Sequence, residues 1–273
     1  MEKVSLHEFR IPFKGIKSKT IYHFSDSHLT EYDNLSTEEE IEKAKKSTVA
    51  WEGVRKGFSE AYGEVYGELQ MQAPKTHFEN LVNTARDGDA LVMAGDVLDY
   101  FNGANLRLFD SVLSSFDKPY IAVCGNHEPP KSTPDGYLFS KAKQEIQKIE
   151  LDDMLIIGIE NAMREITDEQ MGELEAIFKG DKPSLLVMHV PIMTEGNKER
   201  LMKSGVYFQL NYEGCPENNI KFIELIKKYS ENIIAVLAGH LHYSDETLIC
   251  DGVTQYVTAQ GVTGNINRYV IGE

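Results

Sequence analysis

The sequence predicts a mixed α/β fold in which short buried strands alternate with amphipathic helices. Three observations predict it. Five short apolar runs, most of them rich in β-branched residues, have the length of buried strands. Between them lie stretches with helix-capping signals and an apolar repeat of three and four residues. A polar motif follows each apolar run. The runs are residues 20–24, 90–93, 120–123, 185–188 and 233–238.

Length and composition fit one globular domain that covers residues 1–273. The chain is 41% hydrophobic and 26% charged, so it can bury a full core without disulfides. No apolar run is long enough to cross a bilayer, and the charged first 13 residues lack a signal peptide's apolar stretch. Three scattered cysteines (Cys124, Cys215 and Cys250) indicate reduced thiols. We therefore expect a cytoplasmic protein without a membrane partner.

The net charge of −15 restricts the partners of the chain. A protein that coats a nucleic-acid backbone needs clustered Lys and Arg, so no binding to a nucleic-acid duplex is expected. An anionic substrate remains compatible with this charge, because bound divalent cations reverse the local field.

Capping signals predict several helices. Thr167-Asp168-Glu169-Gln170 has the capping-box spacing, and Pro216 suits the first position of a helix. Residues 74–85 follow the same pattern behind a proline. After the last histidine motif, residues 247–257 alternate like antiparallel strands, and residues 269–271 predict a final strand.

A helical insertion is predicted at residues 36–72, after the first apolar run. Ser36-Thr37-Glu38-Glu39 has the spacing of a capping box. Four glycines from Gly53 to Gly67 weaken a continuous helix by roughly 1 kcal/mol each, so a bent helix or a helical hairpin fits as well as one rod. The apolar face either packs on the main body or forms a cap that shapes substrate choice. It comprises Ile41, Ala44, Thr48, Trp51, Phe58, Tyr62, Val65 and Leu69, with Arg55 as an exception.

The polar motifs that follow the apolar runs supply metal-binding side chains. Ligands at the carboxyl ends of buried strands converge on one edge of a sheet. Imidazole nitrogens with carboxylate and amide oxygens suit hard or borderline cations that act on phosphate. The motifs are Asp26-Ser27-His28, Gly95-Asp96-Val97-Leu98-Asp99, Gly125-Asn126-His127-Glu128, Met188-His189-Val190-Pro191 and Gly239-His240-Leu241-His242.

In these motifs the chain resembles the calcineurin-like metallophosphoesterase family. The resemblance implies a four-layer α/β/β/α sandwich, with two mixed sheets face to face and helices outside. It also implies two metal ions, with Mn, Fe or Zn as the leading candidates, bridged by Asp96 and a hydroxide. One metal would be held by Asp26, His28, Asp96 and His242. The other would be held by Asp96, Asn126, His189 and His240.

The resemblance further implies that His127 is the general acid and is oriented by Asp99. A neighbouring carboxylate favours the imidazolium form that a proton donor needs. The implied reaction is in-line attack on a phosphate ester by the hydroxide between the metals. Glu128 is expected to orient its loop rather than bind metal.

Departures from related families narrow the substrate class. Protein phosphatases of this superfamily carry arginines at the places of Tyr100 and Cys124, so the bidentate phosphate clamp is missing here. Purple acid phosphatases place a metal-binding tyrosine where this chain has Asp99. The remaining match is to the bacterial phosphodiesterase-type branch, whose substrates include cyclic nucleotides and glycerophosphodiesters. A phosphomonoesterase or nucleotidase is the alternative, and a non-catalytic scaffold of the same fold is a third hypothesis. The sequence leaves the oligomeric state open.

Overall fold

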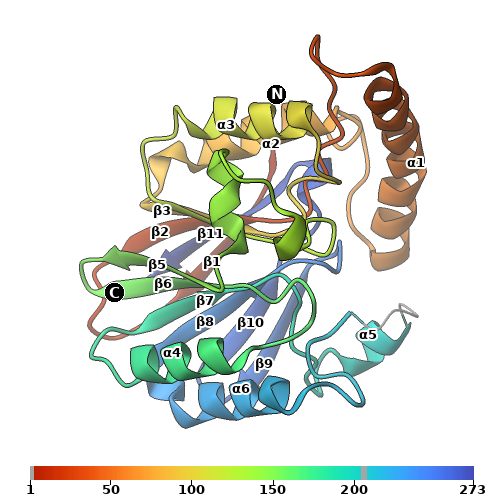
Figure 1. The fold of residues 1–273 in the computed structure, drawn as a ribbon. Coiled ribbons are helices and arrows are strands. Elements are labelled where there is room, and N and C mark those ends of the chain that lie inside the picture. Colours follow the sequence, from red (N-terminus) through yellow and green to blue (C-terminus); the bar gives the residue numbers. More distant parts are fainter. Residues whose placement is uncertain (1–2, 204–207) are drawn as a thin grey trace.

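Two mixed β-sheets pack face to face between outer helices, as Figure 1 shows for the computed structural model. The model describes residues 3–203 and 208–273. Helices α2 (Pro74–Thr84) and α3 (Gly103–Leu113) cover one sheet, and α4 (Asp168–Phe178) and α6 (Glu217–Lys228) cover the other. The predicted four-layer sandwich is therefore confirmed.

The first sheet has five strands in the order β1-β11-β2-β3-β4. Only the β11–β2 pair is antiparallel, so the carboxyl ends of β2, β3 and β4 meet at one edge. The strands are β1 (Ser5–Ile11), β2 (Lys19–Phe24), β3 (Ala90–Ala94), β4 (Tyr120–Val123) and β11 (Asn265–Ile271).

The second sheet has six strands in the order β5-β6-β7-β8-β10-β9. Its central strands β6, β7, β8 and β10 are parallel, and the edge strands β5 and β9 are antiparallel to their neighbours. The strands are β5 (Ile146–Leu151), β6 (Met154–Ile159), β7 (Ser184–Val187), β8 (Ile233–Ala238), β9 (Asp245–Cys250) and β10 (Val253–Val257). Short 3-10 helices span Ala85–Asp87, Pro130–Ser132, Leu138–Lys143, Ser230–Asn232 and Gly261–Thr263.

The core forms three layers, one between the sheets and one beneath each pair of outer helices. In β3, Val92 packs between the sheets, whereas Leu91 and Met93 pack under α2 and α3. Successive side chains of a strand point to opposite faces, so a strand buried on both faces must be apolar throughout. This explains why the central strands appear in the sequence as continuous apolar runs.

The structure extends the predicted elements at the edges of the sheets. β1 and β5 were not predicted, because each is an edge strand in which partly or fully buried residues alternate with exposed ones. β6 and α3 were also missed. With β1 in place, the helical insertion follows the second strand of the chain. The start of α6 was predicted one residue early, because Pro216 precedes the helix.

The insertion contains one continuous helix, α1 (Glu38–Tyr62), and not a hairpin. Its capping box joins Thr37 to Glu40, one residue later than predicted, and it ends at Gly63 in the left-handed conformation. Together with the short helix α5 (Lys198–Lys203), α1 lies at one end of the sandwich, outside the four layers (Figure 1). Val65, assigned to the buried face from sequence, is 73% exposed.

Arg55 anchors α1 between Gly53 and Gly57, the two of the four glycines that lie inside the helix. It was the polar exception on the apolar face, but its side chain is buried and donates hydrogen bonds to the backbone carbonyls of Gln72 and Val262. Gln260 donates in return to the Arg55 carbonyl and to the hydroxyl of Ser59. These contacts tie the middle of the helix to the body of the protein.

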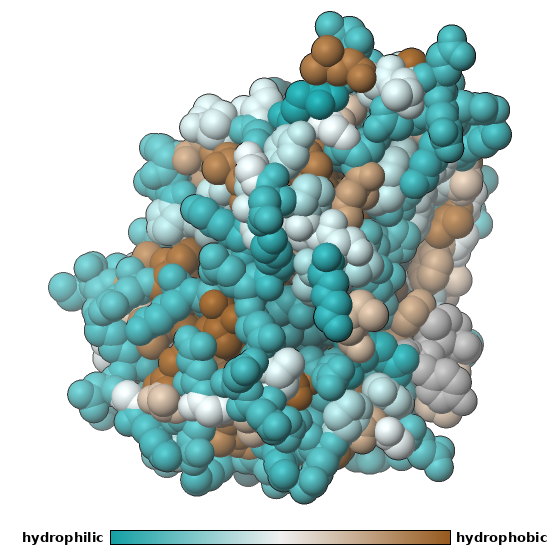
Figure 2. All heavy atoms as spheres, in the orientation of Figure 1, coloured by the Kyte–Doolittle hydropathy of each residue, from teal (hydrophilic) through white to brown (hydrophobic). Residues whose placement is uncertain are grey.

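The surface seen in Figure 2 is mostly hydrophilic, with scattered apolar atoms, in keeping with the charge of the chain. None of the helices in the described part of the chain is long and apolar enough to cross a membrane.

Replacing Arg55 with alanine should lower the free energy of unfolding by about 1–3 kcal/mol, because the buried carbonyl of Val262 and the partly buried carbonyl of Gln72 lose their donor. Lys56→Ala, at an exposed neighbouring position, should change it by less than about 0.5 kcal/mol. Urea denaturation of both variants measures the difference. Equal stabilities would contradict the docking of α1 through Arg55.

Candidate metal centre

The predicted ligands gather at the carboxyl edge of both sheets. The first sheet contributes Asp26, His28, Asp96 and Asn126, and the second contributes His189, His240 and His242. Among the described residues, three groups of side chains each bring their ligand atoms within 4.8 Å of one another. Two of them consist of predicted metal ligands, and the third joins His28 to the predicted acid pair, His127 and Asp99. The first cluster is Asp26, His28 and His242, and the second is Asp96, His189 and His240.

Backbone strain marks the same residues. Among the described residues, six other than glycine have a positive φ, and five of the six are predicted ligands. A positive φ is unfavourable for residues that have a side chain. It persists only where the surrounding structure enforces it, most often at functional sites. The five are Asp26 (55°), His28 (41°), Asp96 (50°), His240 (74°) and His242 (60°).

The loops after β2 and β3 hold each other in this strained form. The backbone N–H of Asp26 donates to the carbonyl of Gly95, and that of His28 donates to the carbonyl of Asp96. Gly125 is required beside them, because a Cβ there would lie 2.0 Å from Oδ1 of Asp96. The glycines in the motifs thus allow the ligand loops to approach closely.

In the first cluster, the ligand atoms lie close together, and one buried carboxylate oxygen accepts no hydrogen bond from a described residue. Nε2 of His242 lies 3.1 Å from Nε2 of His28 and 3.2 Å from Oδ1 of Asp26. Oδ2 of Asp26 accepts the His240 N–H and the hydroxyl of Ser25, whereas Oδ1 accepts no hydrogen bond from any described residue. A buried carboxylate oxygen without a hydrogen-bond donor is costly, and a bound cation would stabilise it.

The second cluster is organised around His189. Its Nε2 lies 3.0 Å from Nδ1 of His240, 3.1 Å from Oδ1 of Asn126 and 3.5 Å from Oδ2 of Asp96. Its Nδ1 lies 2.8 Å from the carbonyl of Ala94, which can only accept, so Nδ1 carries the proton and donates it. Nε2 is thereby left to bind a metal, the usual arrangement of a ligating histidine.

The carboxylate of Asp96 belongs to the second cluster and also faces the first. Its Oδ2 is 3.5 Å from Nε2 of His189 and 4.0 Å from Nε2 of His28, and its Oδ1 accepts the His127 N–H. Burial opposes ionisation, yet the nearby histidines, His189 first, hold the pKa of Asp96 below its usual range. In the same way burial lowers the pKa of His189, but the Asp96 carboxylate outweighs it and raises the value to about 9. The centre therefore attracts positive charge.

His127 lies beside the clusters and is bound to Asp99. Its Nδ1 is 3.0 Å from both the carboxylate Oδ1 and the backbone carbonyl of Asp99. Burial alone would lower its pKa, but hydrogen bonding to Asp99 and the charge of Asp96 raise it to about 9. Its side chain is 32% exposed, and Asn126 beside it is exposed, so the centre opens to solvent here.

Two further residues hold the ligand loops. The carboxylate of Glu128 accepts the backbone N–H groups of Leu98 and Gly125, which is the loop-orienting role expected of it. Asn161, which sequence analysis missed, accepts the N–H groups of His189 and Val190 and donates to the Val190 carbonyl. It follows the apolar strand β6, so the pattern that revealed the other motifs could have found it.

Two histidines outside the motifs, and Cys124 next to one motif, belong to none of these clusters. His7 faces Asn265 at 3.2 Å, and His23 faces the hydroxyl of Tyr269 at 3.4 Å. Cys124 is buried, and burial raises the pKa of its thiol, which disfavours the thiolate needed for metal binding.

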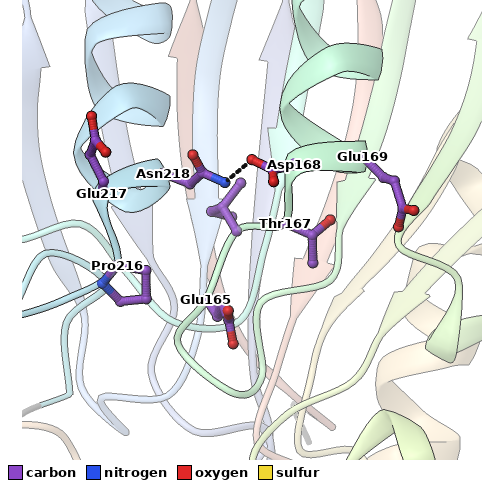
Figure 3. Close-up of a pocket in the computed structure, with 8 residues that line it drawn as sticks. Glu165, Thr167, Asp168, Glu169, Pro216, Glu217 and Asn218 are labelled. Carbon is purple, nitrogen blue, oxygen red and sulfur yellow. Dashed lines mark hydrogen bonds between the residues drawn. The ribbon is translucent and has the colours of Figure 1, made fainter.

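A separate hollow of about 480 Å³ lies where α4 and α6 begin (Figure 3). Four acidic residues line it, and Asn218 donates a hydrogen bond to Asp168 across it. The hollow contains none of the predicted site residues, and its negative charge would repel a phosphate ester. The acidic residues are Glu165, Asp168, Glu169 and Glu217.

Comparison with known proteins agrees with this geometry. Residues 19–244 match the family model described as calcineurin-like phosphoesterase. The glycerophosphodiester phosphodiesterase GpdQ of Enterobacter lignolyticus (strain SCF1) is 23% identical over 194 residues, which are 66% of this chain and 65% of the relative. The chain thus covers slightly less than two thirds of that relative.

Two solved structures share the fold. A dimetal phosphatase from Danio rerio has a TM-score of 0.57 at 12% identity, covering 90% of this chain and 88% of that chain. PhoD has a TM-score of 0.52 at 11% identity, covering 93% of this chain and 58% of that chain.

Replacing Asn161 with alanine should weaken metal binding by about 10- to 100-fold, because the loop that carries His189 loses its buried acceptor. Isothermal titration calorimetry with the metal ion measures the metal affinity. Asn218→Ala removes an amide that bonds at the surface and should leave it unchanged. If both variants bind metal like the parent protein, Asn161 does not position His189.

Proposed function

Because the chain belongs to the calcineurin-like phosphoesterase family, we propose that it hydrolyses a small phosphate ester at a centre of two metal ions. The family is the one that the sequence motifs resemble, so that prediction is confirmed. The observation that carries the proposal is the pair of buried ligand clusters with the Asp96 carboxylate between them.

The donor set of each cluster fits one metal ion. Asp26, His28 and His242 would hold the first ion, with one oxygen of Asp96. Asn126, His189 and His240 would hold the second, again with Asp96. Mixed imidazole, carboxylate and amide ligation suits Mn, Fe or Zn. Bound there, two such ions would supply a water of lowered pKa and neutralise phosphoryl oxygens. The shared fold of the Danio rerio protein, a dimetal phosphatase, supports this assignment.

His127 is the proton donor in this proposal. The carboxylate of Asp99 keeps its imidazole protonated near neutral pH, and the partly exposed ring can reach a substrate at the opening. A protonated imidazole next to the phosphate can give its proton to the departing oxygen, a role worth typically 10²- to 10⁴-fold in rate. The exposed amide of Asn126 lies at the same opening and can contact the phosphate.

The substrate that we propose is a phosphodiester of the glycerophosphodiester or cyclic-nucleotide type. Tyr100 lies beneath the amine of Lys43, 3.8 Å from ring centre to nitrogen, and Cys124 is buried. Neither position supplies the arginine that clamps a phosphoprotein. The resemblance to a glycerophosphodiester phosphodiesterase supports a small diester.

Removal of the metals should abolish activity. Dialysis against a chelator is expected to eliminate hydrolysis of bis(p-nitrophenyl) phosphate, and addition of Mn, Fe or Zn ions should restore it. A panel of glycerophosphodiesters, cyclic nucleotides and monoesters, run with each metal, then identifies the substrate class. A preference for monoesters would contradict the proposed diester substrate. Metal-loaded protein that turns over no substrate of the panel would contradict the proposed hydrolase activity.

Single substitutions distinguish the metal-binding role of Asp96 from the proton-donating role of His127. Asp96→Asn should reduce metal content as well as activity, because it weakens a ligand shared by both ions. His127→Ala should retain metal and lower kcat by about 10²- to 10⁴-fold. Metal analysis and steady-state kinetics distinguish the two, with His7→Ala as the control outside the centre. Full activity in Asp96→Asn would refute the shared ligand.

A further inference from the structure

Helix α1 contacts the candidate centre through one face. Thr48 faces Thr30 at 3.0 Å between their hydroxyl oxygens, and Thr30 lies two residues after His28. Further along the helix, the ring of Phe58 lies 5.2 Å from that of His242, and Tyr62 stacks on Tyr243. The helix therefore touches two of the loops that carry predicted ligands.

Trp51 contacts two of the predicted site residues directly. Its ring stacks on His28 with centroids 4.1 Å apart, and its indole N–H donates to Oδ1 of Asp99 at 2.9 Å. The indole N–H can only donate, so the direction of this bond is certain. The same carboxylate oxygen lies 3.0 Å from Nδ1 of His127 and 3.4 Å from Nδ1 of His28.

Ring nitrogens from three segments thus lie within 3.4 Å of Oδ1 of Asp99, and the indole N–H of Trp51 donates a hydrogen bond to it. The carboxylate is 8% exposed, so water contributes little to fixing it. Without the indole, one of its donors would be lost, and the carboxylate could turn away from His127. A bond to a charged acceptor is among the stronger hydrogen bonds in a protein.

We propose that Trp51 is a positioning residue of the centre: through its bond to Asp99 it keeps His127 directed at the leaving oxygen, and its ring closes the His28 side. This inference rests on the proposed phosphoesterase function. It assigns α1 a part in the reaction itself. Because His28 is buried and covered by this ring while Asn126 is exposed, substrate must enter from the side of Asn126 and His127.

The conservative change Trp51→Phe keeps an aromatic ring and removes the N–H. It should lower kcat for diphenyl phosphate by about tenfold, as expected when a catalytic group loses one charge-assisted hydrogen bond, with KM nearly constant. The loss should be smaller for bis(p-nitrophenyl) phosphate, because its less basic leaving group needs less protonation. Val49→Ala, 70% exposed on the same helix, is the matched control and should behave like the parent protein.

A double variant tests whether Trp51 acts through His127. In the His127→Ala background, Trp51→Phe should change kcat by less than about twofold, because the group that it positions is absent. Equal losses in both backgrounds, or equal losses on both substrates, would overturn the proposal. Thermal unfolding and metal content of Trp51→Phe should match those of Val49→Ala, and loss of metal would likewise overturn it.

Trp51 is the single tryptophan of the chain, so fluorescence provides a readout that is independent of activity. Titrating Mn²⁺ or Co²⁺ into chelator-treated protein should change the emission in a saturable way, since the ring contacts His28. Metal binding with unchanged emission would overturn the placement of Trp51. A fluorescence response in a protein without any turnover would instead overturn the proposed hydrolase, so the two failures are distinguishable.

Discussion

Three buried carboxylates and five imidazoles share one small volume at the end of the two sheets, and the rest of the structure holds them there. Asp26, Asp96 and Asp99 are each at most 8% exposed. Buried carboxylates are costly unless positive charge or hydrogen-bond donors surround them. Here the histidines supply part of that compensation, and the carboxylates in turn raise the pKa values of His127 and His189 to about 9. Metal ions held by the two clusters would supply the remainder.

The two-sheet architecture determines how these groups meet. The carboxylates, His28 and Asn126 follow strands of the first sheet, and His189, His240 and His242 follow strands of the second, so packing of the sheets sets the distance between these two groups of ligands. Sharp turns with positive φ at the strand ends bring the side chains to that contact, and the N–H of His240 bonds directly to Asp26 across the sheets. Helix α1 then closes one side with Trp51, Phe58 and Tyr62.

Much of this arrangement could be predicted from the sequence, and the exceptions have physical reasons. Central strands such as β3 and β8 are buried on both faces, so their apolar runs are evident, whereas β1 alternates as an edge strand does. The ligand motifs are local, and all of their members come together as expected. The position of Asn161 after a strand follows the same pattern as the ligand motifs, but its partners do not appear in that pattern. Asn161 and Trp51 bond to residues 28 and 48 positions away along the chain. The burial of Arg55 could not be predicted for the same reason, because the two carbonyls that accept its hydrogen bonds lie far away along the chain.

The central claim is that two metal ions share the carboxylate of Asp96. Electron paramagnetic resonance of the protein loaded with Mn²⁺ tests it most directly, because ions about 3.5–4 Å apart with common ligands are magnetically coupled. The account predicts two manganese ions per chain and the spectrum of a coupled pair. One ion per chain, or the six-line spectrum of isolated Mn²⁺ at full loading, would contradict it.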